Sequence, residues 1–284
     1  NVLGLLSHYF GEANREKKCA MYSNKSAKAA MSKSVYNQAK YYARRAISSF
    51  ERVENSLSQQ LESNQILITS TMMTEGMGAS NVEMLINKSL EIMKIVGFSN
   101  ENFEFQVYWS LATYNDVRGF HKKTHSVIDI ALNNDLDDGQ RSAMYSLKSH
   151  TLWMQGQLIS ALHYAEKSLE LYDPKIHNNH AEKFGHDSKV MALGMKGMLY
   201  SFLGEYKKSD EESSKAVAYA EELKSYHSIC MAKLYQCCCM YQQRRSTEIS
   251  SIANEIVGIC DSQNMANWGP TVSVVFGWSV GDAD

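Results

Sequence analysis

The chain has 284 residues, of which 44% are hydrophobic and 21% are charged, and this composition excludes intrinsic disorder as the main state. Its 2 prolines and 16 glycines are too few for the closely spaced turns of a β-sandwich or β-barrel. A net charge of −2 does not indicate nucleic-acid binding by the chain as a whole. No apolar run approaches the ~20 residues of a membrane span, and no signal peptide is recognisable.

Apolar residues recur at helical spacing along nearly the whole chain, which predicts long helices with short connections. The predicted helices span 2–11, 14–32, 34–54, 57–74, 80–96, 101–118, 120–133, 138–155, 157–172, 188–203, 206–223, 226–243 and 246–263, and a last helix begins near 268. Asn81, Asp187 and Ser246 are the predicted helix N-caps.

Small residues recur in these helices with a period near 34, which is typical of a repeat of two helices. From 190 to 223 the tetratricopeptide pattern is met by Gly197, Tyr200, Gly204, Tyr206 and Ala216. The same register fits 20–53, 105–136 and 142–174, and 231–263 is a degenerate copy with Arg245 at the turn position.

The array is irregular, because Gly204 lies 48 residues after Gly156, whereas Gly156 lies only 37 after Gly119. The extra length falls between Asp173 and His186. We therefore predict an all-α, right-handed superhelical solenoid of about six or seven tetratricopeptide-like helix pairs, as one array over 1–284. In such an array the Tyr, Met and Leu stripes are core.

The charge is uneven, since residues 1–55 carry a net +6 and the remainder a net −8. Solvated helix faces account for this pattern, and a basic end that docks on a neighbouring domain is the alternative. The six cysteines include the run Cys237, Cys238 and Cys239, whose side chains point about 100° apart on a helix and cannot form a clamp. Free thiols in a reducing cytosol fit best, so the protein is predicted to be cytoplasmic.

Three features could carry chemistry. The thiols of the Cys237–Cys239 run could act as a redox sensor. The simpler interpretation is that these cysteines are small residues that pack in the core. His177, His180 and His186 lie near Glu182 and Asp187, so they could bind zinc or belong to a linker that caps helix ends. No GxSxG elbow occurs, and we predict no catalytic residue, metal or cofactor.

The concave surface of the array is the stronger candidate. Inward positions on the first helix of each pair are expected to bind a protein or peptide partner, with two tryptophans as anchors. These positions are Trp109, Thr113, Asp116, Ser146, His150, Trp153, Met154, Met198, Phe202, Tyr235 and Gln242. The alternatives are that the superhelix buries them, or that they line a small-molecule effector pocket.

The sequence resembles the tetratricopeptide region of large bacterial multidomain predicted-ATPase signalling proteins. In that family a YDP…H…YG-D element links two repeats and precedes a helix that ends in LLGY. The matching residues are Tyr172, Asp173, Pro174, His177, Gly185, Asp187, Leu203, Gly204 and Tyr206. Departures from the pattern are Phe184, His186, Ser188, Phe202 and the inserted Glu205. The segments 6–10, 29–39, 66–91 and 268–278 also resemble the family.

The resemblance implies an ATPase module before Asn1 and an effector domain before that, either a nucleotide cyclase or a transcriptional regulator. The missing initial Met also suggests a C-terminal fragment, and the chain itself holds no GxxxxGK[ST] phosphate loop. We therefore expect a non-catalytic regulatory module whose partners are the ATPase module and a protein or peptide. A small-molecule effector-sensing solenoid of a transcription activator is the alternative.

Overall fold

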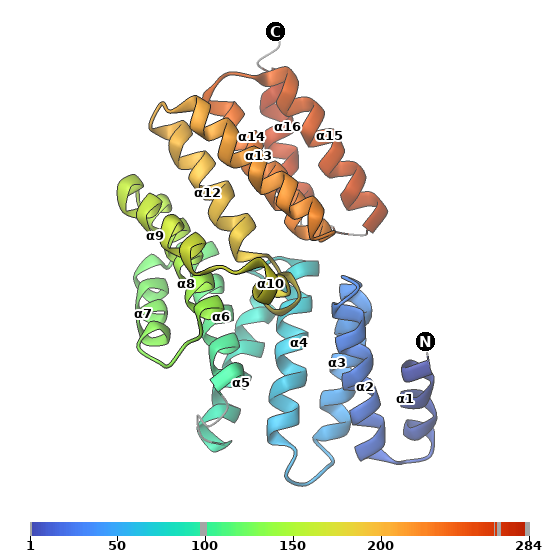
Figure 1. Ribbon diagram of the computed structural model, residues 1–284. Coiled ribbons are helices and arrows are strands. Elements are labelled where there is room, and N and C mark those ends of the chain that lie inside the picture. Colours follow the sequence, from blue (N-terminus) through green and yellow to red (C-terminus); the bar gives the residue numbers. More distant parts are fainter. Residues whose placement is uncertain (1, 97–100, 264, 266–267, 282–284) are drawn as a thin grey trace. The chain divides into compact units, whose positions relative to one another are not determined.

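A computed structural model describes residues 2–96, 101–263, 265 and 268–281, and every regular element in that part of the chain is helical (Figure 1). The sixteen helices of the described part are α1 (Val2–Glu12), α2 (Glu16–Met31), α3 (Tyr36–Phe50), α4 (Leu57–Glu75), α5 (Ser80–Val96), α6 (Glu101–Val117), α7 (His121–Leu132), α8 (Asp138–Met154), α9 (Leu158–Leu171), α10 (Pro174–His177), α11 (His180–Phe184), α12 (Ser188–Phe202), α13 (Tyr206–Glu222), α14 (Tyr226–Gln242), α15 (Ser246–Gln263) and α16 (Gly269–Gly281). None of them has the length and apolar character needed to cross a membrane.

All the predicted helices are present, with ends within four residues of those expected. Sequence periodicity missed the short helices α10 and α11, which are too brief for an apolar stripe to show. They occupy the long spacing between two turn glycines. Of the three predicted N-caps, Asp187 is confirmed. Ser246 and Asn81 lie within α15 and α5, so those two predictions were wrong.

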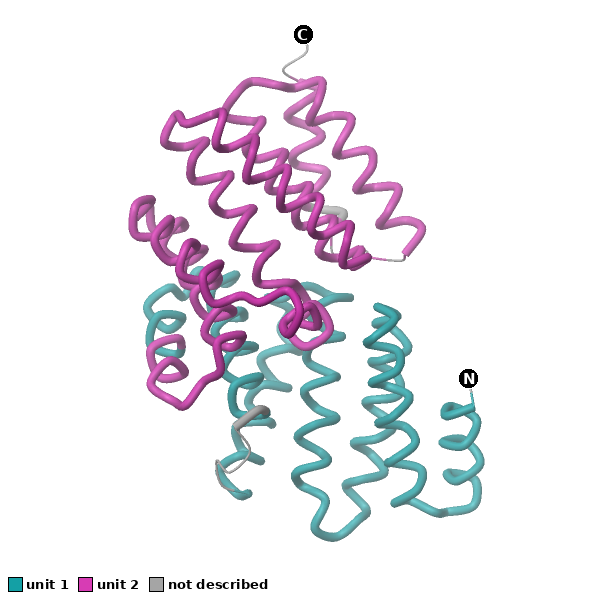
Figure 2. The backbone as a smooth tube through the Cα atoms, in the orientation of Figure 1, with its two compact units in different colours: residues 1–127 teal, residues 128–284 magenta. Residues whose placement is uncertain are grey.

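The chain divides into two compact units, residues 1–127 and residues 128–284 (Figure 2). Consecutive helices pack together in both units, for example α2 with α3 in the first and α8 with α9 in the second, which confirms the repeat of two helices. The single continuous array over 1–284 stays a prediction.

In the first unit, small side chains let paired helices approach closely. Ala27 of α2 and Ala43 of α3 are fully buried in one cluster with Ile47 and Leu67. Both alanines belong to the stretch 20–53, whose small residues the sequence analysis matched to the repeat register. Burial of such apolar surface stabilises the pair by about 25 cal/mol per Å².

In the second unit, Gly197 brings the backbones of α12 and α13 into contact. A methyl group at Gly197 would lie 3.0 Å from the backbone nitrogen of Ser213 and 3.1 Å from the carbonyl oxygen of Ser209. The predicted role of this glycine as the small residue of the first helix is confirmed.

The turns between paired helices use left-handed backbone. Gly119, Gly156 and Gly204 have φ of +74°, +74° and +79°, as glycine permits. In the degenerate copy, Arg244 takes this conformation with φ of 59°. The sequence placed Arg245 there, so the register was wrong by one residue.

Candidate interaction site

The last turns of α8 and α12 carry large apolar side chains at the protein surface. The Trp153 ring is half-buried and its centroid lies 6.3 Å from that of Phe202, which is 43% exposed. Met154, beside Trp153, is 49% exposed. Leu203, which follows Phe202, is also exposed, and the sequence analysis did not select it. We call Trp153, Met154, Phe202 and Leu203 the Trp153 edge.

The neighbours of the Trp153 edge hold its tryptophan in place. The ring of the half-buried His150 precedes Trp153 by one helical turn, and the centroids of the two rings lie 5.4 Å apart. Trp153 is thus contacted by two rings and keeps part of its surface accessible. A rigid aromatic group of this kind suits an anchor position in a protein interface.

The other predicted positions of the second unit are more enclosed. Tyr235 of α14 is half-buried and packs on Gly194 of α12, where a methyl group would clash with its ring. Met198 and Ser146 are buried, and Gln242 is half-buried. The contact of Tyr235 with Gly194 limits the spacing of α12 and α14, which contact each other.

The predicted positions of the first unit lie inside the protein. Trp109, Thr113 and Asp116, all on α6, are buried. Asp116 Oδ1 lies 3.9 Å from His121 Nδ1. Burial of these inward positions is the alternative that the sequence analysis kept open. A role in partner binding stays a prediction for all three residues.

The segment between α9 and α12 is organised around the buried carboxylate of Asp187. Its Oδ1 accepts hydrogen bonds from the backbone N–H groups of Lys189 (2.9 Å) and Val190 (3.1 Å), so Asp187 caps α12. The Tyr172 hydroxyl donates to Oδ2 at 2.5 Å, and the Tyr219 hydroxyl lies 3.2 Å from that of Tyr172. Burial raises the pKa of Asp187 to about 6, because these hydrogen bonds offset only part of the desolvation.

The other residues of the family-like motif shape the same linker. Asp173 caps α10 by accepting from Lys175 N–H at 2.9 Å, and its own N–H donates to His177 Nδ1 at 2.9 Å. Gly185 ends α11 with φ of +84°. The motif is therefore accounted for by backbone capping, which supports the linker interpretation of the histidine cluster.

Two stacked histidines of the linker rest on the first turn of α8. The rings of His177 and His180 lie 5.4 Å apart, and a methyl group at Gly139 would lie 2.7 Å from the first and 3.0 Å from the second. His180 Nδ1 is hydrogen-bonded to Ser188 Oγ at 2.9 Å. Burial lowers the pKa of His180 to about 3. Among the described residues, no group of three or more His, Cys, Asp or Glu side chains could hold a metal ion.

Gly139→Ala should destabilise the protein, although alanine favours a helix by about 1 kcal/mol. The added methyl group must displace two packed imidazoles, which costs about 1–3 kcal/mol. Gly258→Ala in α15 is the matched control, because a methyl group there meets nothing within 4 Å and should stabilise by about 0.5–1 kcal/mol. Urea denaturation measures both variants. Equal stabilisation by the two substitutions would show that the packing of His177 and His180 does not require a glycine at position 139.

The cysteine run belongs to the core of the second unit. Cys237 and Cys239 are buried, Cys238 is half-buried, and all three are free thiols. Burial raises the pKa of Cys237 and Cys238 to about 12 and that of Cys239 to about 11. A redox sensor needs a readily formed thiolate. These values favour packing over redox chemistry.

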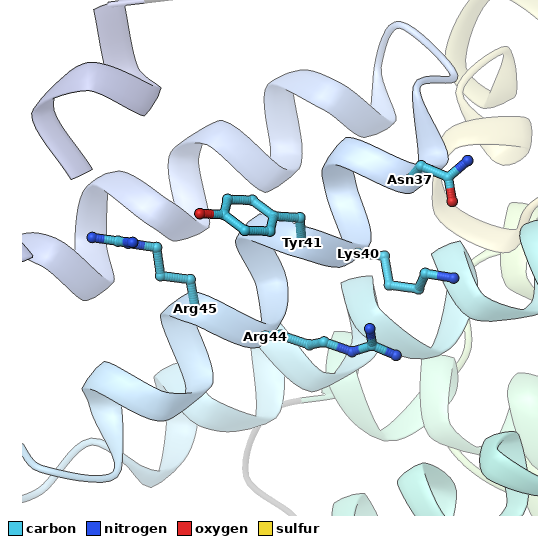
Figure 3. Close-up of a pocket in the computed structure, with 5 residues that line it drawn as sticks. All are labelled: Asn37, Lys40, Tyr41, Arg44 and Arg45. Atoms are coloured by element: carbon cyan, nitrogen blue, oxygen red, sulfur yellow. The ribbon is translucent and has the colours of Figure 1, made fainter. Parts of the chain in front are cut away.

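One face of α3 forms a basic pocket of about 440 Å³, shown in Figure 3, lined by Asn37, Lys40, Tyr41, Arg44 and Arg45. Lys40 and Arg45 point in opposite directions along the helix (Figure 3). Lys40 pairs with Glu75 at 2.7 Å, and Arg45 donates to the carbonyl oxygen of Ser7 at 3.3 Å. Lys40 and Arg45 thus already have partners within the first unit. This favours the interpretation of the basic residues as a solvated helix face.

No family model matches the chain, and no curated protein matches it. Among solved structures it is similar to the apo form of RapI, with a TM-score of 0.53 and 12% sequence identity over 93% of this chain and 71% of RapI. At this identity the likeness concerns the fold alone. It confirms an all-α, tetratricopeptide-like solenoid of consecutive helix pairs.

Proposed function

We propose that this chain is a non-catalytic interaction module that binds a protein segment on the Trp153 edge. The observation that carries the proposal is the contact between Trp153 and Phe202, which joins two successive repeats at an accessible apolar surface. An aromatic side chain that is partly exposed to water becomes buried when a partner binds, and such anchor residues contribute most of the binding energy of an interface. The solenoid fold supports this role, because stacked helix pairs present extended surfaces to partners.

The buried ionisable groups of the second unit support a structural and not a catalytic use. The pKa values of His180, His186 and His227 are lowered by burial, and those of the neighbouring thiols are raised. These histidines and thiols are therefore neutral near pH 7. Neutral, enclosed side chains can pack and accept hydrogen bonds, but solvent and substrate do not reach them.

The wider context of the module comes from the sequence resemblance. We propose that the module acts in the cytoplasm within an ATPase-linked signalling protein and reports partner binding to the ATPase module. The mechanism is linkage: a partner that binds one arrangement of the repeats more tightly stabilises that arrangement, and the attached module responds to the difference. Neither nucleic acid nor a membrane is required.

Selection of peptides on the immobilised chain tests the binding site. Peptides from a random library should bind the wild type, and Trp153→Ala with Phe202→Ala should weaken binding at least about 10-fold by fluorescence anisotropy. Ile159→Ala is the control, because this side chain is 69% exposed on α9 and lies outside the edge. Failure to select any peptide, or equal affinities for the double variant and the wild type, would contradict the proposal.

A further inference from the structure

Within residues 1–127, the helices α5 and α6 and the start of α7 form a groove of about 400 Å³. Glu83 and Leu90 line it from α5, Leu111 and Asn115 from α6, and Lys123 from α7. Lining residues on each helix are spaced three or four apart, so one face of each helix turns toward the groove. The volume lies within the about 300–1,000 Å³ of small-molecule sites.

Opposite charges line this groove without neutralising each other. Glu83 accepts a hydrogen bond from the Tyr114 hydroxyl at 3.0 Å, but no cation pairs with it among the residues that the structure describes. The Lys123 ammonium lies 5.0 Å from the centre of the Phe120 ring, and none of the described carboxylates pairs with it. Both charges are therefore available to a ligand.

The side chain of Asn115 also lines the groove. Asn115 is 6% exposed, and within the described ranges its side chain has no hydrogen-bond partner. The amide offers both hydrogen-bond donors and an acceptor to a polar group of a ligand. The half-buried Leu90 and Leu111 add an apolar surface.

We propose that this groove binds a zwitterionic ligand with an apolar body, namely a free apolar amino acid. The ligand ammonium pairs with Glu83, its carboxylate pairs with Lys123, and its side chain covers Leu90 and Leu111. The Asn115 amide then hydrogen-bonds to the ligand's polar end. This activity would be small-molecule sensing, and it does not depend on partner binding at the Trp153 edge, whose residues are different.

Calorimetric titration of the chain with L-phenylalanine and with L-leucine tests the site. Saturable binding is expected, with Glu83→Gln and Lys123→Gln each weakening it at least about 10-fold. Ligand analogues that lack one of the two charges should distinguish the two variants. Glu83→Gln should weaken phenylalaninamide, which keeps the ammonium, and Lys123→Gln should weaken N-acetylphenylalanine, which keeps the carboxylate.

Matched controls lie on the same helices. Glu91→Gln and Lys122→Gln change exposed charges on α5 and α7 that do not line the groove, and both should bind like the wild type. Glu83 and Lys123 are exposed, so their variants should keep the helical circular-dichroism spectrum of the wild type. The absence of saturable binding of both amino acids up to about 10 mM, or equal effects of control and groove variants, would overturn the proposal.

Discussion

Acidification from about pH 6.5 to pH 4 should unfold the second unit cooperatively. Near pH 5 the free energy of unfolding is expected to fall by about 3 kcal/mol for each unit by which the pH is lowered. A loss of this size is large compared with the about 5–15 kcal/mol by which domains are stable. Urea denaturation at several pH values, followed by tryptophan fluorescence, measures the slope, and three of the four tryptophans lie in 128–284.

The sign follows from four buried groups of the second unit. Burial lowers the pKa of His180, His186 and His227 to about 3, 4 and 3, from the 6.5 of an exposed imidazole. Their contribution to stability is complete above pH 6.5 and is lost as the pH falls toward the folded-state values. Asp187 acts oppositely, since its pKa rises from 3.8 to about 6, so its contribution is complete below pH 3.8 and is lost as the pH rises. Unfolding near pH 5 thus takes up about two protons in total.

His227→Gln should reduce the slope by about one proton, whatever it does to the stability at neutral pH. His227 is fully enclosed, and its Nδ1 accepts a hydrogen bond from Trp268 Nε1 at 3.0 Å. His163→Gln, at an exposed position on α9, serves as the control. A flat stability profile between pH 4.5 and pH 6.5 in the wild type would refute the neutral buried state of the three histidines.

Asp187→Ala and Asp187→Asn should have very different consequences at pH 7. Alanine removes both cap bonds to Lys189 and Val190 and leaves the Tyr172 hydroxyl without its carboxylate, which should cost about 3 kcal/mol. Asparagine keeps a cap oxygen and removes the carboxylate charge, whose burial raises the pKa of Asp187. Asp187→Asn should therefore be close to wild type or more stable.

Urea midpoints of the two variants at pH 7 and pH 5 make the comparison. The stability of Asp187→Asn relative to wild type should decline on acidification, because the wild-type carboxyl becomes protonated in the folded state and loses its penalty. Equal destabilisation by alanine and asparagine would mean that the charge of Asp187, and not its capping geometry, holds the linker.

Much of the fold could be predicted from the sequence, because helix pairs repeat the same small residues at the same positions. Ala27, Ala43 and Gly197 mark close helix contacts, and each is found there. The short helices α10 and α11 could not be predicted, since side-chain capping by Asp173 and burial of His180 define them. Local periodicity carries neither signal.

The candidate site was harder to predict, because repeat position alone does not determine exposure. Met154 and Phe202 occupy predicted inward positions and are exposed, whereas Met198 and Trp109 occupy equivalent positions and are buried. The exposure of each side chain depends on which neighbouring helix covers its turn. That depends on tertiary packing, which the repeat pattern does not determine. The groove between α5, α6 and α7 escaped notice for the same reason, since its charges are far apart in the sequence.

Photo-crosslinking of a selected peptide tests the central claim, that the Trp153 edge binds a partner segment. A photoreactive amino acid placed at Met154 or at Leu203 should form an adduct with the peptide, whereas the same group at Ile159 on α9 should not. All three positions are exposed, so accessibility alone does not distinguish them. Adducts at both edge positions would support the account, and adducts at Ile159 with none at the edge would contradict it.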